Sequence, residues 1–231
     1  MSWPDRIDQL LRRLKWPAAW LSLASTPLLV WGLLKLLLRI LPSPLGLLPF
    51  VLGTVGFIVV WRRFLRTSRM GRFAMTLEHE STHALFALLC MHRIVGFRAS
   101  VGRGGEVRFT GKGNWLITAA PYFFPTAAIL LFLIAYVLPF PGLPWQSFLL
   151  GVALGYHVVS TYRETTRDQP DIQQLGTKFC WMFLPAANLA VVSLLIAFAY
   201  GRSSEMNQWL SDLSQPVRLL ISSMWRLASA T

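Results

Sequence analysis

Four of the few acidic and histidine residues of the chain lie within one short run, Glu78-His79-Glu80-Ser81-Thr82-His83. The pattern His79-Glu80-x-x-His83 is typical of a helix that binds zinc. Residues four positions apart share one face of a helix, so both imidazoles can reach the same metal ion. Glu80 is placed beside the first histidine, where it can take a proton from an attacking water and return it to the leaving amine. We therefore predict that His79 and His83 are zinc ligands and that Glu80 is the catalytic base.

The residues around this motif are apolar, both in 73–77 before it and in 84–90 after it. One alternative is that the motif contributes only polar side chains to an exposed surface helix. Its apolar flanks disfavour that interpretation, because charged residues inside an apolar helix are costly and usually have a function.

A catalytic zinc needs a third protein ligand besides the two histidines. Four of the remaining acidic residues lie in the terminal segments, and Glu106 has basic neighbours. The candidates that remain are close together near residue 168: Glu164, Asp168 and Asp171. His157 lies on a similar helical face to Glu164, but a lone histidine in an apolar helix is more often a packed core residue.

The composition indicates the elements that must hold these side chains. Hydrophobic residues make up 54% of the chain and charged residues only 14%, against about 25% charged in a typical soluble domain. A membrane span needs about 20 apolar residues, and the stretches that qualify in whole or part are 18–38, 45–61, 73–91, 115–138, 145–162 and 179–200. We predict an all-α polytopic membrane protein with about five to six transmembrane helices, located in the cell membrane.

The net charge of +12 would suit nucleic-acid binding in a soluble protein. Here the basic residues instead cluster at the edges of apolar stretches, as the positive-inside rule predicts. The densest cluster is Arg62, Arg63, Arg66, Arg69 and Arg72. We expect that loop to be cytoplasmic, the lipid bilayer to be the main partner, and no nucleic acid to bind.

A change of periodicity follows the motif helix. Apolar residues alternate with polar or small ones from Val95 to Val101 and again at Val107 and Phe109, on either side of Arg103-Gly104-Gly105. Alternation around a glycine-rich turn predicts a small β-hairpin. Such a hairpin is either a solvated loop or a strand edge that can pair with an extended substrate.

Both ends of the chain have amphipathic patterns. We expect residues 1–16, which open with Ser2 and Pro4, to form an interfacial helix rather than a cleavable signal peptide. Residues 17–201 then form the transmembrane domain. Residues 202–231 form an amphipathic C-terminal segment broken at Pro216. The two cysteines, Cys90 and Cys180, lie in apolar stretches and are expected to be buried rather than disulfide-bonded.

The motif in an apolar helix, the hairpin after it and a later aspartate beside a proline together resemble the site-2-protease family of intramembrane zinc metallopeptidases. The resemblance covers roughly residues 73–175. It implies that His79 and His83 bind zinc, that Glu80 is the general base, and that a distant aspartate in a proline-containing segment is the third ligand. That aspartate maps best to Asp171, which follows Pro170, although the Asn-Pro and Asp-Gly pairs usual in the family are absent and Asp168 is close by.

Another assignment uses the spacing of Glu164 and Asp168. It is similar to that of membrane-bound gluzincin peptidases that process prenylated proteins, in which a glutamate is the third ligand and the aspartate orients a histidine. Two further classes are a catalytically silent relative that binds membrane proteins, disfavoured by the intact Glu80, and a di-iron lipid desaturase. The desaturase needs more histidines than the four present.

The expected activity is hydrolysis of peptide bonds in membrane-embedded or juxtamembrane protein substrates. Asn114 or Asn188 is a possible donor to the oxyanion. Three full crossings between His79 and Asp171 would place them on opposite membrane faces, so one intervening segment cannot be a simple crossing. The break at the prolines 121 and 125 and the hairpin are both compatible with a re-entrant passage, and the sequence does not indicate which segment forms it. The sequence indicates neither the oligomeric state nor the identity of the substrate.

Overall fold

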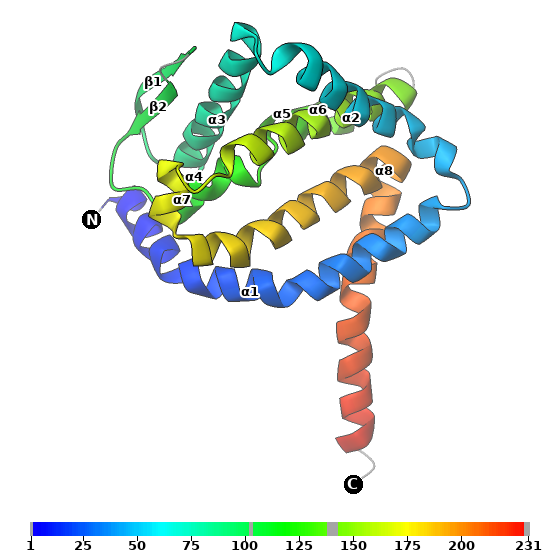
Figure 1. Cartoon of the computed structure of the whole chain (residues 1–231). Helices are drawn as coiled ribbons and strands as arrows, with labels where there is room; N and C mark the ends of the chain where they lie inside the picture. Colours follow the sequence, from blue (N-terminus) through cyan, green and yellow to red (C-terminus); the bar gives the residue numbers. More distant parts are fainter. Residues whose placement is uncertain (1, 102–103, 138–142, 229–231) are drawn as a thin grey trace.

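The computed structural model describes residues 2–101, 104–137 and 143–228 and is mostly helical, with one two-stranded hairpin (Figure 1). In chain order the elements are α1 (Trp3–Ile40), the 3-10 turn η1 (Pro44–Leu47), α2 (Leu48–Val60), the π-helical turn η2 (Trp61–Leu65), α3 (Arg69–Leu89), β1 (Ile94–Ser100), β2 (Gly104–Phe109), α4 (Trp115–Ala119), the 3-10 turn η3 (Ala120–Tyr122), α5 (Thr126–Val137), α6 (Leu143–Glu164), α7 (Pro170–Leu175) and α8 (Thr177–Ala228). Cys90 and Cys180 are buried and free, as expected.

Helix α1 is a single helix that lies along the first part of α8 (Figure 1). Ser2 and Asp5 form a capping box at its start, with Pro4 in the first turn. Pro17 and Pro27 are both inside the helix, which continues through them. The segment expected at the interface and the first apolar span are therefore continuous.

Helices α2 and α6 pack closely because glycines face the backbone of the partner helix. A β-carbon on Gly53 would overlap the Phe148 carbonyl of α6, and one on Gly151 would overlap the Phe50 carbonyl of α2. Gly155, one turn beyond Gly151, also faces the backbone of α2. Small residues spaced by four let helices approach closely where lipid supplies no hydrophobic driving force. This contact fixes α6, whose last residue is Glu164.

The predicted hairpin is confirmed. Strands β1 and β2 pair antiparallel, with Arg98 opposite Glu106, and lie beside α3 (Figure 1). Gly104 and Gly105, expected in the turn, already belong to β2, while Arg103 is outside the described residues. Glu106 is close to Arg98 and Arg108, so its charge has basic neighbours as expected.

The helix break expected at the two prolines is present between α4 and α5. The segments Trp115–Tyr122 and Thr126–Ile134 are bent by 81° relative to each other. The end of the predicted span at Leu138 and most of the loop after it are outside the described residues. A bend of this size suits either a broken span or a re-entrant loop.

Helix α8 contains a sharp kink at Gly201 and Arg202, whose dihedral angles are not helical. Beyond the kink the helix projects away from the rest of the molecule (Figure 1). Ion pairs from Arg39 at the end of α1 to Glu205 and Asp212 hold its first turns. The break expected at Pro216 is not present, because the helix continues through it.

Within the part of the chain that the structure describes, three helical segments are long and apolar enough to span a membrane: Trp3–Ile40, Pro44–Leu65 and Thr177–Arg226. The bent pair would make a fourth. Five to six were expected, and α3 and α6 fall short because charged and polar side chains lower their hydropathy.

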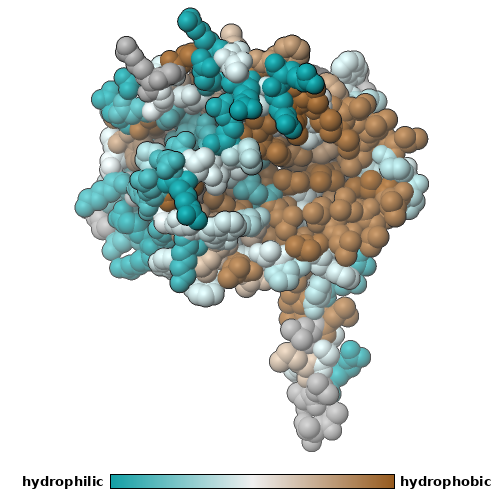
Figure 2. Space-filling model, viewed as in Figure 1, coloured by the Kyte–Doolittle hydropathy of each residue, from teal (hydrophilic) through white to brown (hydrophobic). Residues whose placement is uncertain are grey.

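Hydrophilic side chains gather at the end that carries the hairpin and the start of α1, and hydrophobic ones at the opposite end (Figure 2).

The arginine cluster forms a shorter loop than expected. Arg62 and Arg63 are in η2, while Arg69 and Arg72 are in the first turn of α3. Only residues 66–68 lie between the two elements. All five arginine side chains of the cluster are exposed.

Candidate metal centre

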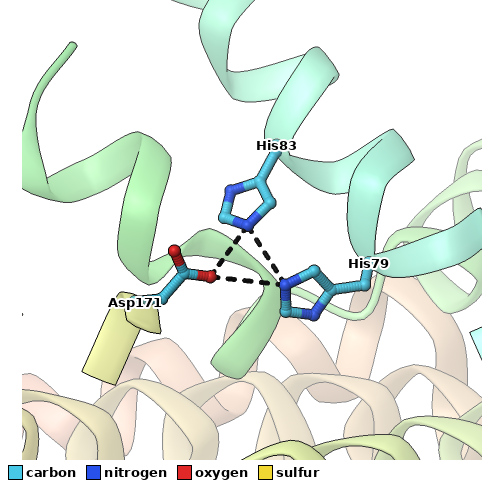
Figure 3. Close-up of side chains that lie close together, drawn as sticks. All are labelled: His79, His83 and Asp171. Atoms are coloured by element: carbon cyan, nitrogen blue, oxygen red, sulfur yellow. Dashed lines mark hydrogen bonds and ion pairs between the residues drawn. The ribbon is translucent and has the colours of Figure 1, made fainter. Parts of the chain in front are cut away.

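His79 and His83 project from one face of α3 toward Asp171 in the first turn of α7 (Figure 3). The two Nε2 atoms are 3.1 Å apart. Oδ2 of Asp171 lies 3.1 Å from Nε2 of His83 and 3.4 Å from Nε2 of His79. Pro170 begins α7, which places Asp171 at the helix start, beside the two histidines.

These three atoms have the separation that a tetrahedral zinc site requires. With metal–ligand bonds of about 2.0–2.1 Å, ligand atoms are separated by about 3.3 Å. The observed separations of 3.1, 3.1 and 3.4 Å are close to that value. Nitrogen and carboxylate oxygen are also the ligand types of catalytic zinc sites. His79, His83 and Asp171 could therefore hold a zinc ion.

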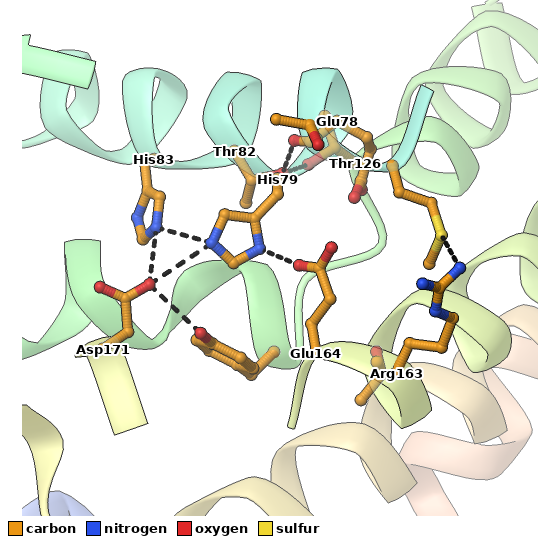
Figure 4. Close-up of polar contacts among 12 residues, drawn as sticks. Glu78, His79, Thr82, His83, Thr126, Arg163, Glu164 and Asp171 are labelled. Carbon is orange, nitrogen blue, oxygen red and sulfur yellow. Dashed lines mark hydrogen bonds and ion pairs between the residues drawn. The ribbon is translucent and has the colours of Figure 1, made fainter. Parts of the chain in front are cut away.

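The other nitrogen of each imidazole is held by an acceptor. Nδ1 of His83 donates to the carbonyl oxygen of Ile117 in α4, over 2.8 Å. Nδ1 of His79 contacts the Glu164 carboxylate at the end of α6, on the far side of the ring from Asp171 (Figure 4). Because both Nδ1 atoms donate, both Nε2 lone pairs are available to a metal.

Asp171 is also fixed by its neighbours. Burial raises the pKa of Asp171, but the adjacent His79 and His83 outweigh that effect and hold the pKa well below its usual range. The hydroxyl of Tyr122 donates to the same carboxylate oxygen over 3.2 Å. Tyr122 therefore holds the same carboxylate oxygen that faces the two Nε2 atoms.

Glu80 lies on the same helix and lines a cleft of about 480 Å³ together with His79, His83 and Asp171. Strand β2 forms another wall of this cleft. A β-carbon on Gly105 would lie 2.5 Å from Cδ of Glu80, which is well inside contact distance. Glycine at position 105 lets the strand pass this close to the carboxylate without displacing it.

The other candidates from the sequence lie elsewhere. Asp168 is exposed in the turn between α6 and α7 and does not line the cleft. Asn114 caps α4 with its Oδ1 and donates from Nδ2 to Asp8. Asn188 contacts His157, which is buried in the core. Neither asparagine lines the cleft, so the geometry favours neither as an oxyanion donor.

Tyr122 and Gly105 were not singled out as site residues by the sequence. Tyr122 lies between the two prolines of the helix break, and that position is the one local signal that could have indicated it. Gly105 was assigned only to the hairpin turn. Its position over Glu80 depends on how the hairpin folds back on α3.

A family model described as Peptidase M50B-like matches residues 50–167, just over half of the chain. The chain belongs to the Peptidase M50B-like family. The match confirms the resemblance to site-2 proteases inferred from the motif. Searches of curated proteins and of solved structures gave no significant match.

The matched region of this M50B-like protein includes α3, the hairpin and Glu164 at the end of α6. It ends at residue 167, four positions before Asp171. The family match therefore includes His79, Glu80 and His83, whereas the position of Asp171 rests on the geometry of the site alone.

Proposed function

We propose that this M50B-like protein is a membrane-embedded zinc metalloendopeptidase that hydrolyses peptide bonds of membrane or juxtamembrane substrates. One observation carries the proposal. Nε2 of His79, Nε2 of His83 and Oδ2 of Asp171 converge at zinc-ligand separations, and Glu80 lines the same cleft.

The residues have separate roles in the proposed reaction. Zinc, when bound, supplies Lewis-acid polarisation of the scissile carbonyl and makes water a better nucleophile. Glu80 takes the proton of the attacking water and passes it to the leaving amine. Glu164 and the Ile117 carbonyl keep the two imidazoles turned toward the metal position.

The hairpin supplies a surface for the substrate backbone. Within the sheet β2 pairs with β1 on one side, and its residues Gly105, Val107 and Phe109 line the cleft. We propose that an extended substrate segment pairs with the free edge of β2. This pairing would bring a peptide bond beside Glu80.

We further propose that the protein crosses the cell membrane several times, with α3 and α6 also inside the bilayer. His79, Glu80 and His83 of α3 and Glu164 of α6 line the cleft, and ionisable residues within a membrane are tolerated when they face such an interior site. The bent segment α4–η3–α5 is then the re-entrant passage that brings His79 and Asp171 to the same depth. Substrate proteins and lipid are the expected partners.

Two alternative functional assignments have less structural support than the proposed zinc peptidase. A silent relative that only binds membrane proteins would not require Glu80, yet Glu80 lines the cleft beside the three ligand candidates. The gluzincin assignment needs Glu164 as the third ligand. Glu164 faces Nδ1 of His79, away from the point where the two Nε2 atoms converge (Figure 4).

The test uses the purified full chain in detergent, loaded with zinc and mixed with labelled casein and a single-span membrane reporter. Wild type should cleave at least one of them, and a zinc chelator should stop cleavage. Glu80→Gln should retain zinc and lose cleavage by several orders of magnitude, because an amide cannot accept the water proton. Cleavage by Glu80→Gln at the wild-type rate would refute the mechanism.

A further inference from the structure

Tyr122 is connected to a set of buried polar residues that the proposed reaction does not use. Its side chain is completely buried, and its hydroxyl donates to Oδ2 of Asp171 over 3.2 Å. The ring packs edge-on against His79, with centroids 5.5 Å apart and planes at 86°. Tyr122 therefore touches two of the three proposed ligands.

The backbone of Tyr122 lacks its helical partners. Residue 125 is proline and has no N–H, while the N–H of Thr126 bonds to the Phe124 carbonyl instead. The helix break therefore frees the Tyr122 carbonyl. A buried carbonyl without a donor is costly, and more so in a membrane protein.

Asn188 in α8 supplies that donor. Its Nδ2 lies 2.9 Å from the Tyr122 carbonyl and 3.0 Å from the Leu184 carbonyl. Both partners only accept, so the amide must present its NH₂ to them and its Oδ1 to His157. Nε2 of His157 is 3.1 Å from that oxygen and must donate to it.

A series of hydrogen bonds thus runs from His157 through Asn188 to Tyr122 and ends at the metal centre. We infer that Tyr122 is a positioning residue that holds Asp171 for the metal, and that Asn188, itself held by His157, fixes the helix break that presents Tyr122. The inference rests on the proposed function, because it assigns Asp171 to the metal.

The chemistry of the carboxylate explains why a tyrosine suits this position. Oδ2 has two lone-pair directions, so it can face a metal with one and accept the Tyr122 hydroxyl with the other. Phenylalanine would fill the same space without fixing the carboxylate. Partners of this kind typically change metal affinity by about 10–100-fold.

The test compares Tyr122→Phe with Tyr156→Phe in the full chain. Tyr156 is also a largely buried tyrosine, but its hydroxyl donates to the Ala74 carbonyl over 2.9 Å and not to a proposed ligand. Zinc affinity is measured by competition with a chromophoric chelator, and the visible absorption spectrum of the Co²⁺-loaded protein reports the coordination geometry. Tyr122→Phe should weaken zinc binding by about 10–100-fold and change the Co²⁺ spectrum. Tyr156→Phe should match wild type in both.

Asn188→Leu tests the second half of the inference, since leucine has similar volume and no donor. It should weaken zinc binding in the same direction as Tyr122→Phe. An unchanged affinity and spectrum in Tyr122→Phe would overturn the inference, and unchanged values in Asn188→Leu alone would overturn the role of Asn188. A wild-type chain that binds no zinc would refute the proposed function itself, and the inference with it.

Discussion

Glu164 at the end of α6 contacts Nδ1 of His79, on the opposite side of the ring from Asp171. A carboxylate can only accept, so this contact fixes the tautomer of His79 and turns its Nε2 lone pair toward His83 and Asp171. It also links the helix that carries the histidine motif to the helix that precedes Asp171. The glutamate is thus placed to orient a ligand.

Replacing Glu164 should weaken metal binding without abolishing it. In Glu164→Ala the His79 ring loses its orienting acceptor, and we expect zinc affinity to fall by about 10–100-fold. Chelator competition on the purified chain measures this. The exposed Asp168→Ala is the matched control and should bind as wild type. Complete loss of zinc from Glu164→Ala would instead support Glu164 as a ligand.

A side chain at position 105 should disable the proposed base. In Gly105→Ala the added methyl group overlaps Glu80, so either the carboxylate or strand β2 must move. A displacement of about 1 Å in a catalytic group can cost about 100-fold in rate. We expect kcat to fall by about that factor with zinc content unchanged. Gly56→Ala, where the added methyl meets no atom within 4 Å, is the control. Equal rates for both variants would show that Glu80 does not act from this position.

The parts of the site that the sequence predicts are those with local signals. His79 and His83 are one helical turn apart, so their shared face follows from spacing alone. The hairpin follows from period-two alternation. The helix break follows from the prolines at 121 and 125, which remove backbone donors.

What the sequence does not predict depends on contacts between distant segments. Asp8 was expected on an interfacial helix, yet it is 1% exposed and bonded to His92 and Asn114, which are 84 and 106 positions away. The Tyr122–Asp171 and His79–Glu164 contacts are of the same kind. The helices also continue through Pro27 and Pro216, so a proline alone does not locate a helix break.

The burial of Asp8 leads to a prediction about the stability of the protein. Its Oδ1 accepts from Asn114 over 2.7 Å and from His92 over 3.0 Å. Asp8→Ala leaves both donors buried without this acceptor and should lower the free energy of unfolding by about 3 kcal/mol. Thermal unfolding in detergent measures the loss against Gln9→Ala, an exposed neighbour on the same helix. Equal melting temperatures for the two variants would show that the contact contributes nothing.

The arginine cluster leads to a prediction about which side of the membrane this loop faces. Five arginines and no acidic residue lie between 62 and 72, so this loop should face the cytoplasm. A cysteine introduced at the exposed Thr67 should resist a membrane-impermeant thiol reagent in intact cells and react after permeabilisation. Efficient labelling in intact cells would reverse the proposed orientation.

The most direct test of the metal centre is the zinc content of the purified chain with and without Asp171. A zinc site that loses one of three protein ligands binds far more weakly than one that loses an orienting contact. Asp171→Ala should therefore lose both zinc and cleavage, while Asp168→Ala retains about one zinc per chain. Full zinc occupancy in Asp171→Ala would contradict the assignment of Asp171 and the centre built on it.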